Sequence, residues 1–327
     1  MRDWAELLRV SALFTVPGDA LAGGAATGLR PNRGTAYAMG ASLCLYEAGM
    51  ALNDWADRDE DAVDRPHRPL PSGRISPTAA LGAAGLLTAA GLTLAARAGR
   101  PALAVATALT ATVWAYDLRL KHTPAAPAAM AAARALDLLL GATATTAAPA
   151  ATTSARGRGP QPPAARRRQD SGNALRVAAP AAALAAHTYA VTAVSRTEAH
   201  GGSTLNPLAA LGATTALGAL VATERATAGP VAQRRATAGR VPAGRVPAGL
   251  VPALLAAAYV RTAAVPCLHA ALNPSPPLTQ RAVGGGIRAM IPLQAALAAR
   301  SGAGVTGIAV MGLVPLARTL ARKVSPT

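Results

Sequence analysis

Residues 53–64 read NDWADRDEDAVD and directly follow an apolar run. This stretch holds six acidic residues, although the whole 327-residue chain has only fifteen. Asp54, Asp57 and Asp61 are spaced by three and then four residues, so on one helix they would share a face. Three like charges on one face repel each other, which favours a bound cation. Mg²⁺ is the expected ion, because it takes oxygen ligands and commonly keeps phosphate oxygens beside them.

Basic residues follow the acidic stretch within a turn or two, in the segment RPHRPLPSGRIS at 65–76. For an acidic cluster alone, the simplest interpretation is a solvated end of a membrane span. The basic residues favour another interpretation, a diphosphate site. In such a site carboxylates hold the metal, while guanidinium groups bind the phosphate oxygens.

The composition is that of a membrane protein: 51% of the residues are hydrophobic and 14% are charged. Apolar stretches of about 20 residues, long enough to cross a bilayer, recur along the chain. The ninth stretch contains Pro292 and three consecutive glycines, so we expect it to be broken or interfacial. The sequence therefore predicts an all-α membrane bundle of about nine transmembrane helices. The candidate spans are 10–28, 36–53, 77–97, 101–118, 125–148, 174–194, 205–223, 250–270, 284–299 and 302–321.

The net charge of +17 does not indicate a nucleic-acid partner. Aromatic residues for base stacking make up only 3% of the chain, and nucleic-acid-binding surfaces commonly use them. Basic loops beside apolar spans more simply indicate contact with anionic membrane lipids and a fixed topology. Membrane lipids are therefore expected partners, and nucleic acid is not.

The chain is expected to form one membrane domain over 1–327, with low-complexity insertions at about 151–173 and 224–249. If the acidic stretch faces the cytoplasm, so do the basic loops 54–76 and 119–124, as the positive-inside rule requires. The insertions are also rich in arginine but fall on the opposite side, against that rule. We expect an integral protein of the bacterial cell membrane whose active site faces the cytoplasm.

The pattern Asn53-Asp54-x-x-Asp57-x-x-x-Asp61, followed by Arg-x-x-Arg-Pro-Leu-Pro-Ser-Gly, resembles the first aspartate motif of the UbiA superfamily of intramembrane prenyltransferases. The match is ungapped through Ser76. The resemblance implies a UbiA-like helical bundle that transfers a prenyl group from a prenyl diphosphate to a small acceptor. It also implies Mg²⁺ as the cofactor and diphosphate as the leaving group.

The resemblance further implies roles for individual residues. Asp54, Asp57 and Asp61 would be the catalytic metal ligands. Tyr116 and Lys121 would belong to a loop after the fourth span that supports the leaving group, although an interfacial lysine is an ordinary feature of membrane helices. Asn53 would help to hold Mg²⁺ and the diphosphate, and Arg65 and Arg68 would either contact the diphosphate or brace the carboxylates.

The second aspartate motif departs from the family pattern. It should lie near 187–202, where typical members carry several aspartates, but this stretch offers only Glu198, with Arg196 nearby. Thr188 and Ser195 stand where acids are expected. Either a divergent subfamily binds the second metal weakly or replaces it with Arg196 and His200, or the protein has lost activity. The ordered pattern around Glu198 favours divergence.

Three further charged residues lie within or beside predicted spans. Asp19 follows Pro17 and Gly18, and an intramembrane acid of this kind is expected to line the substrate cavity, with a location at the membrane interface as the alternative. Arg134 and Asp137 are spaced for a structural ion pair, which is at least as good an interpretation as acceptor binding.

Two other functions compete with prenyl transfer. A transporter with an acidic ion site would carry acids near the middle of several spans, whereas here they cluster mainly at one interface. A catalytically inactive membrane scaffold would explain the unusual second motif. CDP-alcohol phosphotransferases also use spaced aspartates, but with a different spacing and glycine content. The identity of the acceptor does not follow from the sequence.

Overall fold

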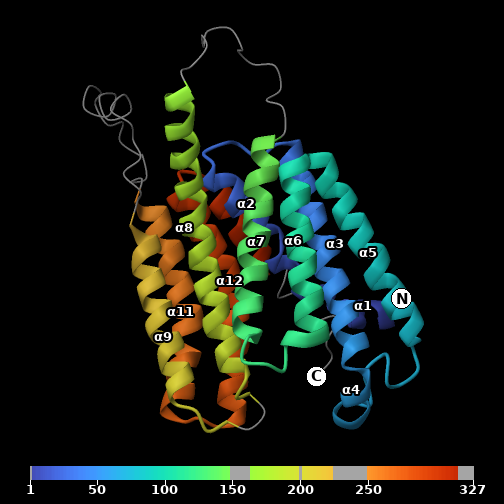
Figure 1. The fold of residues 1–327 in the computed structure, drawn as a ribbon. Coiled ribbons are helices and arrows are strands. Elements are labelled where there is room, and N and C mark those ends of the chain that lie inside the picture. Colours follow the sequence, from blue (N-terminus) through green and yellow to red (C-terminus); the bar gives the residue numbers. More distant parts are fainter. Residues whose placement is uncertain (1, 148–162, 199–200, 224–248, 316–327) are drawn as a thin grey trace.

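The computed structural model describes residues 2–147, 163–198, 201–223 and 249–315, and these form a bundle of helices (Figure 1). The long helices run roughly along one common direction, so each buries an apolar stripe against its neighbours. They are α2 (Pro17–Ala26), α3 (Arg33–Ala56), α5 (Pro77–Ala98), α6 (Arg100–Ala115), α7 (Ala126–Ala147), α8 (Pro163–Ser195), α9 (Leu205–Ala222), α11 (Leu250–Leu272) and α12 (Pro276–Arg300).

Short helical segments occupy the ends of the bundle and the connections. One of them, α4, directly follows α3 and lies at the lower end of the bundle in Figure 1. A π-helical turn, η2, continues α6 at the same end. These segments are α1 (Arg2–Leu7), η1 (Val10–Thr15), α4 (Arg58–Asp64), η2 (Tyr116–Leu120) and α13 (Gly304–Met311).

Six helices of the described chain are long and apolar enough to cross a membrane: α5, α7, α9, α11, α12 and residues 174–195 of α8. In α2, with 10 residues, and α6, with 16, the α-helical segment is shorter than a full span. α3 is long enough but interrupts its apolar face with polar residues. All three pack inside the same bundle (Figure 1). The predicted all-α membrane architecture is therefore confirmed.

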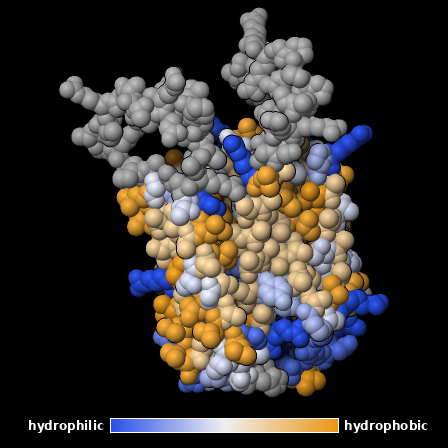
Figure 2. Space-filling view, turned by 60° about the vertical axis from the view of Figure 1, so that its left-hand side comes forward, coloured by the Kyte–Doolittle hydropathy of each residue, from blue (hydrophilic) through white to orange (hydrophobic). Residues whose placement is uncertain are grey.

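The surface of the bundle also fits a membrane. Figure 2 shows apolar side chains over most of the visible flank, while hydrophilic residues gather at its lower right. Helices α9 and α11 carry exposed leucines, such as Leu208 and Leu254. Large exposed apolar surfaces of this extent are disfavoured in water and are covered by lipid tails in a bilayer.

The expectation of a broken or interfacial helix near 284–299 is wrong. α12 runs without interruption through Pro292 and is largely buried among the other helices. The glycines permit close packing: a Cβ at Gly286 would lie 2.4 Å from a methyl carbon of Val191, and one at Gly285 would lie 2.8 Å from the ring of Pro266. Small residues at helix contacts are common in membranes, because packing replaces the hydrophobic effect there.

The predicted insertions lie largely outside the described residues. Of the first, at about 151–173, the part from residue 163 onward belongs to helix α8 and is not a loop. Of the second, at about 224–249, only Gly249 is described. The helix ends that flank both gaps lie at the end of the bundle opposite α4 (Figure 1).

Helix α2 approaches α7 very closely. A Cβ at Gly23 would lie 1.9 Å from the carbonyl oxygen of Leu138, and one at Gly141 would lie 2.3 Å from that of Ala20. Only glycine permits this backbone contact. As a result Asp19, one turn before Gly23 on α2, is brought beside the polar residues of α7.

Candidate active site

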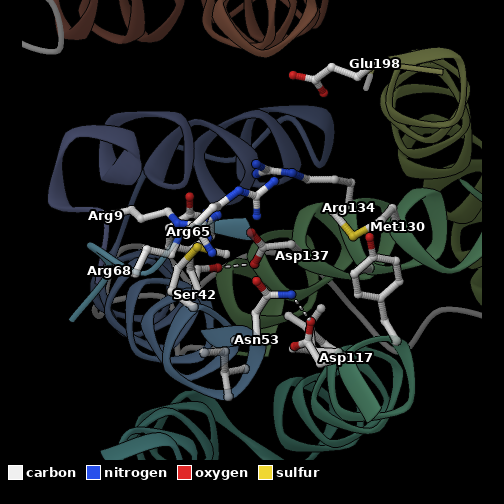
Figure 3. Close-up of a pocket in the computed structure, with 18 residues that line it drawn as sticks. Arg9, Ser42, Asn53, Arg65, Arg68, Asp117, Met130, Arg134, Asp137 and Glu198 are labelled. Carbon is white, nitrogen blue, oxygen red and sulfur yellow. Dashed lines mark hydrogen bonds between the residues drawn. The ribbon is translucent and has the colours of Figure 1, made fainter. Parts of the chain in front are cut away.

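A cavity of about 520 Å³ lies between α3, α6 and α7 and extends to the segments that follow α4 and α8 (Figure 3). Its walls combine apolar side chains with charged and polar groups that project inward. The lining residues are Arg9, Ser42, Leu45, Tyr46, Gly49, Met50, Asn53, Arg65, Arg68, Leu109, Val113, Tyr116, Asp117, Met130, Ala133, Arg134, Asp137 and Glu198.

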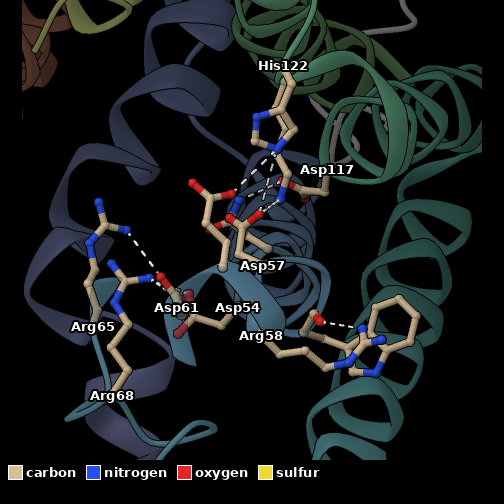
Figure 4. A network of polar contacts seen from close by, with 12 residues as sticks. Asp54, Asp57, Arg58, Asp61, Arg65, Arg68, Asp117 and His122 are labelled. Atoms are coloured by element: carbon tan, nitrogen blue, oxygen red, sulfur yellow. Dashed lines mark hydrogen bonds and ion pairs between the residues drawn. The ribbon is translucent and has the colours of Figure 1, made fainter. Parts of the chain in front are cut away.

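The helix that carries the acidic motif ends in the middle of the motif. α3 stops at Ala56, Asp57 adopts φ −89° and ψ 3°, and α4 begins at the next residue. Asp54, Asp57 and Asp61 therefore do not share the face of a single helix, contrary to the expectation from their spacing. Because the chain bends at Asp57, the side chains of Asp54 and Asp61 lie near each other, whereas Asp57 projects towards His122 (Figure 4).

Arg68 joins the two buried aspartates. Its Nη1 lies 2.7 Å from Oδ2 of Asp61 and 3.6 Å from Oδ1 of Asp54. Asp61, which is only 2% exposed, also contacts Arg65 at 3.3 Å. Buried carboxylates are stable only when they are paired and hydrogen-bonded, and here arginines fill that role (Figure 4).

Arg9 is a second partner of Asp54, with 3.0 Å between Arg9 Nη2 and Asp54 Oδ1. The backbone of Arg9 has φ 47° and ψ 48°, the left-handed region that non-glycine residues rarely adopt. Strain of this kind persists where the surrounding structure holds it, and it is frequent at functional sites. Arg9 itself lies in the cavity wall.

Asp57 accepts a hydrogen bond from Lys121, which lies in the segment after η2. His122 Nε2 is 3.9 Å from Asp57 and 4.0 Å from Glu60. Ligand atoms of Asp57, Glu60 and His122 all lie within 4.8 Å of one another, so this group could hold a metal ion. Glu60 and His122 were not singled out from the sequence, although both adjoin residues that were.

Asn53 and Asp117 form a polar pair across the cavity wall, with Asn53 Nδ2 donating to Asp117 Oδ1 at 3.2 Å (Figure 3). Asp117 and the neighbouring Tyr116 belong to the π-helical turn η2. Such turns are rare and frequently occur at functional sites. Asp117 lies between Tyr116 and Lys121 in the chain, but the sequence did not assign it a role.

The divergent second motif contributes one residue to the cavity, Glu198, which projects into it from the segment after α8 (Figure 3). Loss of solvent around Glu198 raises the pKa of its carboxyl, and the nearby Arg65 opposes this effect. Arg196 does not line the cavity and instead donates to the carbonyl oxygen of Thr123. That bond ties the segment after α8 to the segment after η2.

The two positions where the family pattern expects acids do not face the cavity. The hydroxyl of Thr188 donates to the carbonyl of Leu184 at 2.9 Å, and that of Ser195 donates to the carbonyl of Thr192 at 2.8 Å. Both side chains thus bond to their own helix. His200 lies outside the described residues.

Asp19 is not exposed to the cavity, so the expectation that it lines the wall is corrected. It is 0% exposed and forms an ion pair with Arg134, which does line the cavity. The predicted ion pair between Arg134 and Asp137 is replaced by this contact, because α2 packs so closely on α7. Asp137 accepts a hydrogen bond from Ser42 instead (Figure 3).

Among the site residues predicted from the sequence, five line the cavity: Asn53, Arg65, Arg68, Tyr116 and Glu198. The structure places the others behind that wall or around its rim, where several of them hold the lining residues. These are Asp19, Asp54, Asp57, Asp61, Lys121 and Arg196.

Comparison with known proteins gives a consistent result. The family model described as "UbiA prenyltransferase family" matches residues 11–223. A digeranylgeranylglyceryl phosphate synthase of Methanopyrus kandleri is 36% identical over 129 residues, which cover 38% of this chain and 46% of that protein. The chloroplast chlorophyll synthase of Oryza sativa is 54% identical over 33 residues, covering 10% of this chain and 9% of that protein. The matched stretches thus span less than half the length of these relatives.

A solved structure shows the same fold over nearly the full length. A UbiA homologue from Archaeoglobus fulgidus, bound to GPP and Mg²⁺, superposes with a TM-score of 0.55 at 15% sequence identity. The superposition covers 95% of this chain and 99% of the homologue.

Proposed function

The chain belongs to the UbiA prenyltransferase family, and on this premise we propose that it is a membrane prenyltransferase. It moves a prenyl group from a prenyl diphosphate to a small acceptor, with Mg²⁺ as the cofactor and diphosphate as the leaving group. One observation carries the proposal: each aspartate of the motif is paired with a cation at the cavity. Asp54 contacts Arg9, Asp57 contacts Lys121, and Asp61 contacts Arg65 and Arg68.

These ion pairs complement a metal diphosphate. A bound complex of Mg²⁺ and diphosphate offers positive charge to the carboxylates and negative charge to the arginines and the lysine. When the complex binds, each carboxylate can exchange its basic partner for the metal, and each basic group can exchange its carboxylate for a phosphate oxygen. No buried charge is then left without a partner. An all-oxygen set of carboxylates is also the ligand chemistry that Mg²⁺ prefers. When bound, the metal supplies Lewis-acid stabilisation of the negative charge that builds up on the leaving group.

Individual residues have different proposed roles in binding the metal and the diphosphate. Asp54, Asp57 and Asp61 are the proposed metal ligands. Arg65 and Arg68 bind the diphosphate oxygens, since both line the cavity and carry forked donors suited to phosphate. Lys121 and Tyr116 are proposed to bind the departing diphosphate, and Asn53 to orient Asp117 through its hydrogen bond.

Glu198 is proposed as the carboxylate that the divergent second motif retains, and Arg196 holds its segment in place. The apolar walls of the cavity, such as Leu45, Val113 and Met130, exclude water from the allylic cation that forms as the C1–O bond breaks. The acceptor then attacks C1. Digeranylgeranylglyceryl phosphate and chlorophyll, the products named for the relatives, differ in chemistry, so they do not fix the acceptor of this chain.

We further propose that the end of the bundle with the acidic motif faces the cytoplasm of a bacterial cell. Arginines and lysines near that end include Arg58, Arg74, Arg119 and Lys121, as the positive-inside rule requires for a cytoplasmic face. The domain is taken as one unit over 1–327, since helices from both halves of the chain pack in one bundle.

The test uses the purified full-length protein in nanodiscs with radiolabelled geranylgeranyl diphosphate and a membrane extract as the source of acceptor. We expect release of diphosphate and formation of a labelled lipid with Mg²⁺, and neither with EDTA. Asp54→Ala and Asp57→Ala should lose turnover but keep the folded helical content of the wild type. Turnover that persists in either variant, or without any divalent metal, would refute the proposed function. Wild-type protein that is folded yet inert would favour the inactive scaffold.

A further inference from the structure

A second polar cluster lies in the cavity wall, away from the acidic motif. It consists of Ser42 on α3 and of Arg134 and Asp137 on α7, and all three line the cavity (Figure 3). Ser42 precedes Asn53 by eleven residues on the same helix. Along the helix axis it therefore lies about 16 Å from Asn53, on the side away from the acidic motif. Polar side chains at this depth of a membrane bundle are costly and are commonly functional.

Buried residues hold the cluster in position from behind. Asp19, fully buried on α2, pairs with Arg134, and Gln294 of α12 donates to Asp19 at 2.7 Å and to the carbonyl of Thr15 at 2.6 Å. The guanidinium of Arg134 is thereby fixed, and its side chain stays 17% exposed. Four helices, α2, α3, α7 and α12, thus contribute to one preorganised set of donors and acceptors, the arrangement that binding sites use to fix a ligand's orientation.

The charge of the cluster limits what it can bind. Arg134 is the one cation among these residues, and the two carboxyl groups of Asp19 and Asp137 lie beside it and interact with it. The cluster therefore has no positive charge left to compensate a phosphate or a carboxylate. A buried anion without a counter-charge is strongly disfavoured, whereas a hydroxyl group can accept from Arg134, donate to Asp137 and do either with Ser42.

We propose that Ser42, Arg134 and Asp137 form the acceptor-binding end of the cavity, and that the acceptor is an uncharged, polyhydroxylated molecule. This inference rests on the proposed function. C1 of the prenyl diphosphate is bonded to the diphosphate, so it lies near the arginines of the motif. An acceptor that meets C1 there and also reaches Ser42 needs one hydroxyl to react and others to bind the cluster.

The transfer step forms an ether. The acceptor hydroxyl oxygen bonds to C1 while the bond between C1 and the diphosphate oxygen breaks, and that electron pair leaves with the diphosphate. The hydroxyl proton passes to the diphosphate, whose oxygens gain negative charge as they depart. The products are a prenyl ether of the polyol and protonated diphosphate, and no oxidant or reductant is needed.

The first experiment compares acceptors of matched shape and different charge. The purified protein with Mg²⁺ and radiolabelled geranylgeranyl diphosphate is given glycerol, myo-inositol or glucose, then glycerol 1-phosphate or inositol phosphate, and 4-hydroxybenzoate. We expect a labelled ether with at least one neutral polyol, at a rate roughly tenfold or more above that of its phosphate. A product only with the phosphates or with 4-hydroxybenzoate would overturn the proposal. The proposal would also be overturned if diphosphate were released in the presence of Mg²⁺ but no neutral polyol gave a product. If no diphosphate were released at all, the proposed function itself would be refuted.

The second experiment tests the residues. Ser42→Ala and Asp137→Asn should each raise the KM for the polyol about tenfold, whereas Thr107→Ala should leave it unchanged. Thr107 is the matched control, because its exposed hydroxyl bonds only to its own helix at Leu103. Asp19 is a positioning residue, and Asp19→Asn removes one of the two carboxyl groups beside Arg134. This variant should shift the preference between polyol and polyol phosphate towards the phosphate. A purely structural role would lower both rates equally, so an unchanged ratio in a folded Asp19→Asn protein would contradict the assignment.

Discussion

Arg68 connects Asp54 and Asp61 across the break between α3 and α4, with its Nη1 2.7 Å from Asp61 and 3.6 Å from Asp54. Two carboxylates on different helices are thereby held by one guanidinium at the wall of a cavity. A metal diphosphate would take over both partners at once, since the carboxylates gain a cation and the guanidinium gains phosphate oxygens.

Replacement of Arg68 should affect both stability and donor binding. In Arg68→Leu, Asp54 and Asp61 lose a shared partner while they remain buried, so we expect a loss of about 2 kcal/mol in the free energy of unfolding. The KM for the prenyl diphosphate should rise at least about tenfold, because a forked contact to phosphate is lost. Thermal unfolding and steady-state kinetics measure the two effects.

Arg119→Leu is the control, since Arg119 is exposed and outside the cavity. Equal effects in both variants would contradict a specific role of Arg68.

Replacement of Lys121 should act on the chemical step. Lys121→Met removes the cation next to Asp57 and, in the proposed mechanism, a charge that stabilises the departing diphosphate. Removal of one such donor typically costs about 10²- to 10³-fold in kcat. Rapid-quench measurement of a single turnover separates this effect from donor binding. A normal single-turnover rate in Lys121→Met would show that the lysine is only an interfacial anchor.

Glu198 tests whether the divergent second motif retains a function. Glu198→Gln preserves the size of the side chain and removes the charge, so the concentration of Mg²⁺ needed for half-maximal turnover should rise about tenfold. The measurement is a Mg²⁺ titration at saturating prenyl diphosphate. Glu60→Gln is a useful comparison, because Glu60 lies on α4 beside Asp57 and His122. An unchanged Mg²⁺ dependence in Glu198→Gln would mean that the segment after α8 does not contribute to metal binding.

The close contact of α2 with α7 can be tested apart from catalysis. In Gly23→Ala the new methyl group would meet the carbonyl oxygen of Leu138 at 1.9 Å, so α2 must shift away and loosen the pair of Asp19 with Arg134. Overpacking of this kind costs about 1 to 3 kcal/mol. Gly82→Ala is the matched control, since no atom lies within 4 Å of its added Cβ. Thermal unfolding should show a lower Tm for Gly23→Ala alone, and equal Tm values would contradict the packing.

Much of the architecture could be predicted because apolar length is a strong signal. The spans at 77–97, 125–148 and 205–223 agree closely with α5, α7 and α9. The prediction of a broken helix at 284–299 was wrong, because glycine and proline break helices in water but are tolerated in membrane helices, where glycine permits close packing. Its glycines instead accommodate Val191 and Pro266 of neighbouring helices, contacts between segments far apart in the chain.

The site could be predicted only where its residues are neighbours in the chain. The acidic motif, Arg65 and Arg68 were found from their local pattern in the chain, and Glu198 was found from the resemblance to the family's second aspartate motif. The pairing of Arg134 with Asp19 joins residues 115 positions apart, and it replaced the local pairing with Asp137 that their spacing suggested. The bend at Asp57 likewise depends on tertiary contacts, since Lys121 holds its side chain from a separate segment.

The central claim is that the acidic motif holds Mg²⁺ bridged to a prenyl diphosphate. The most direct measurement is a cryo-electron microscopy or crystal structure of the protein with Mg²⁺ and geranyl thiolodiphosphate, an analogue that resists ionisation. We predict metal density within about 2.0 to 2.1 Å of oxygens from Asp54, Asp57 or Asp61, with Arg65 and Arg68 turned from Asp61 to the diphosphate. A saturated complex in which Asp54 still pairs with Arg9, Asp61 still pairs with Arg68 and no metal lies between the aspartates would contradict the claim.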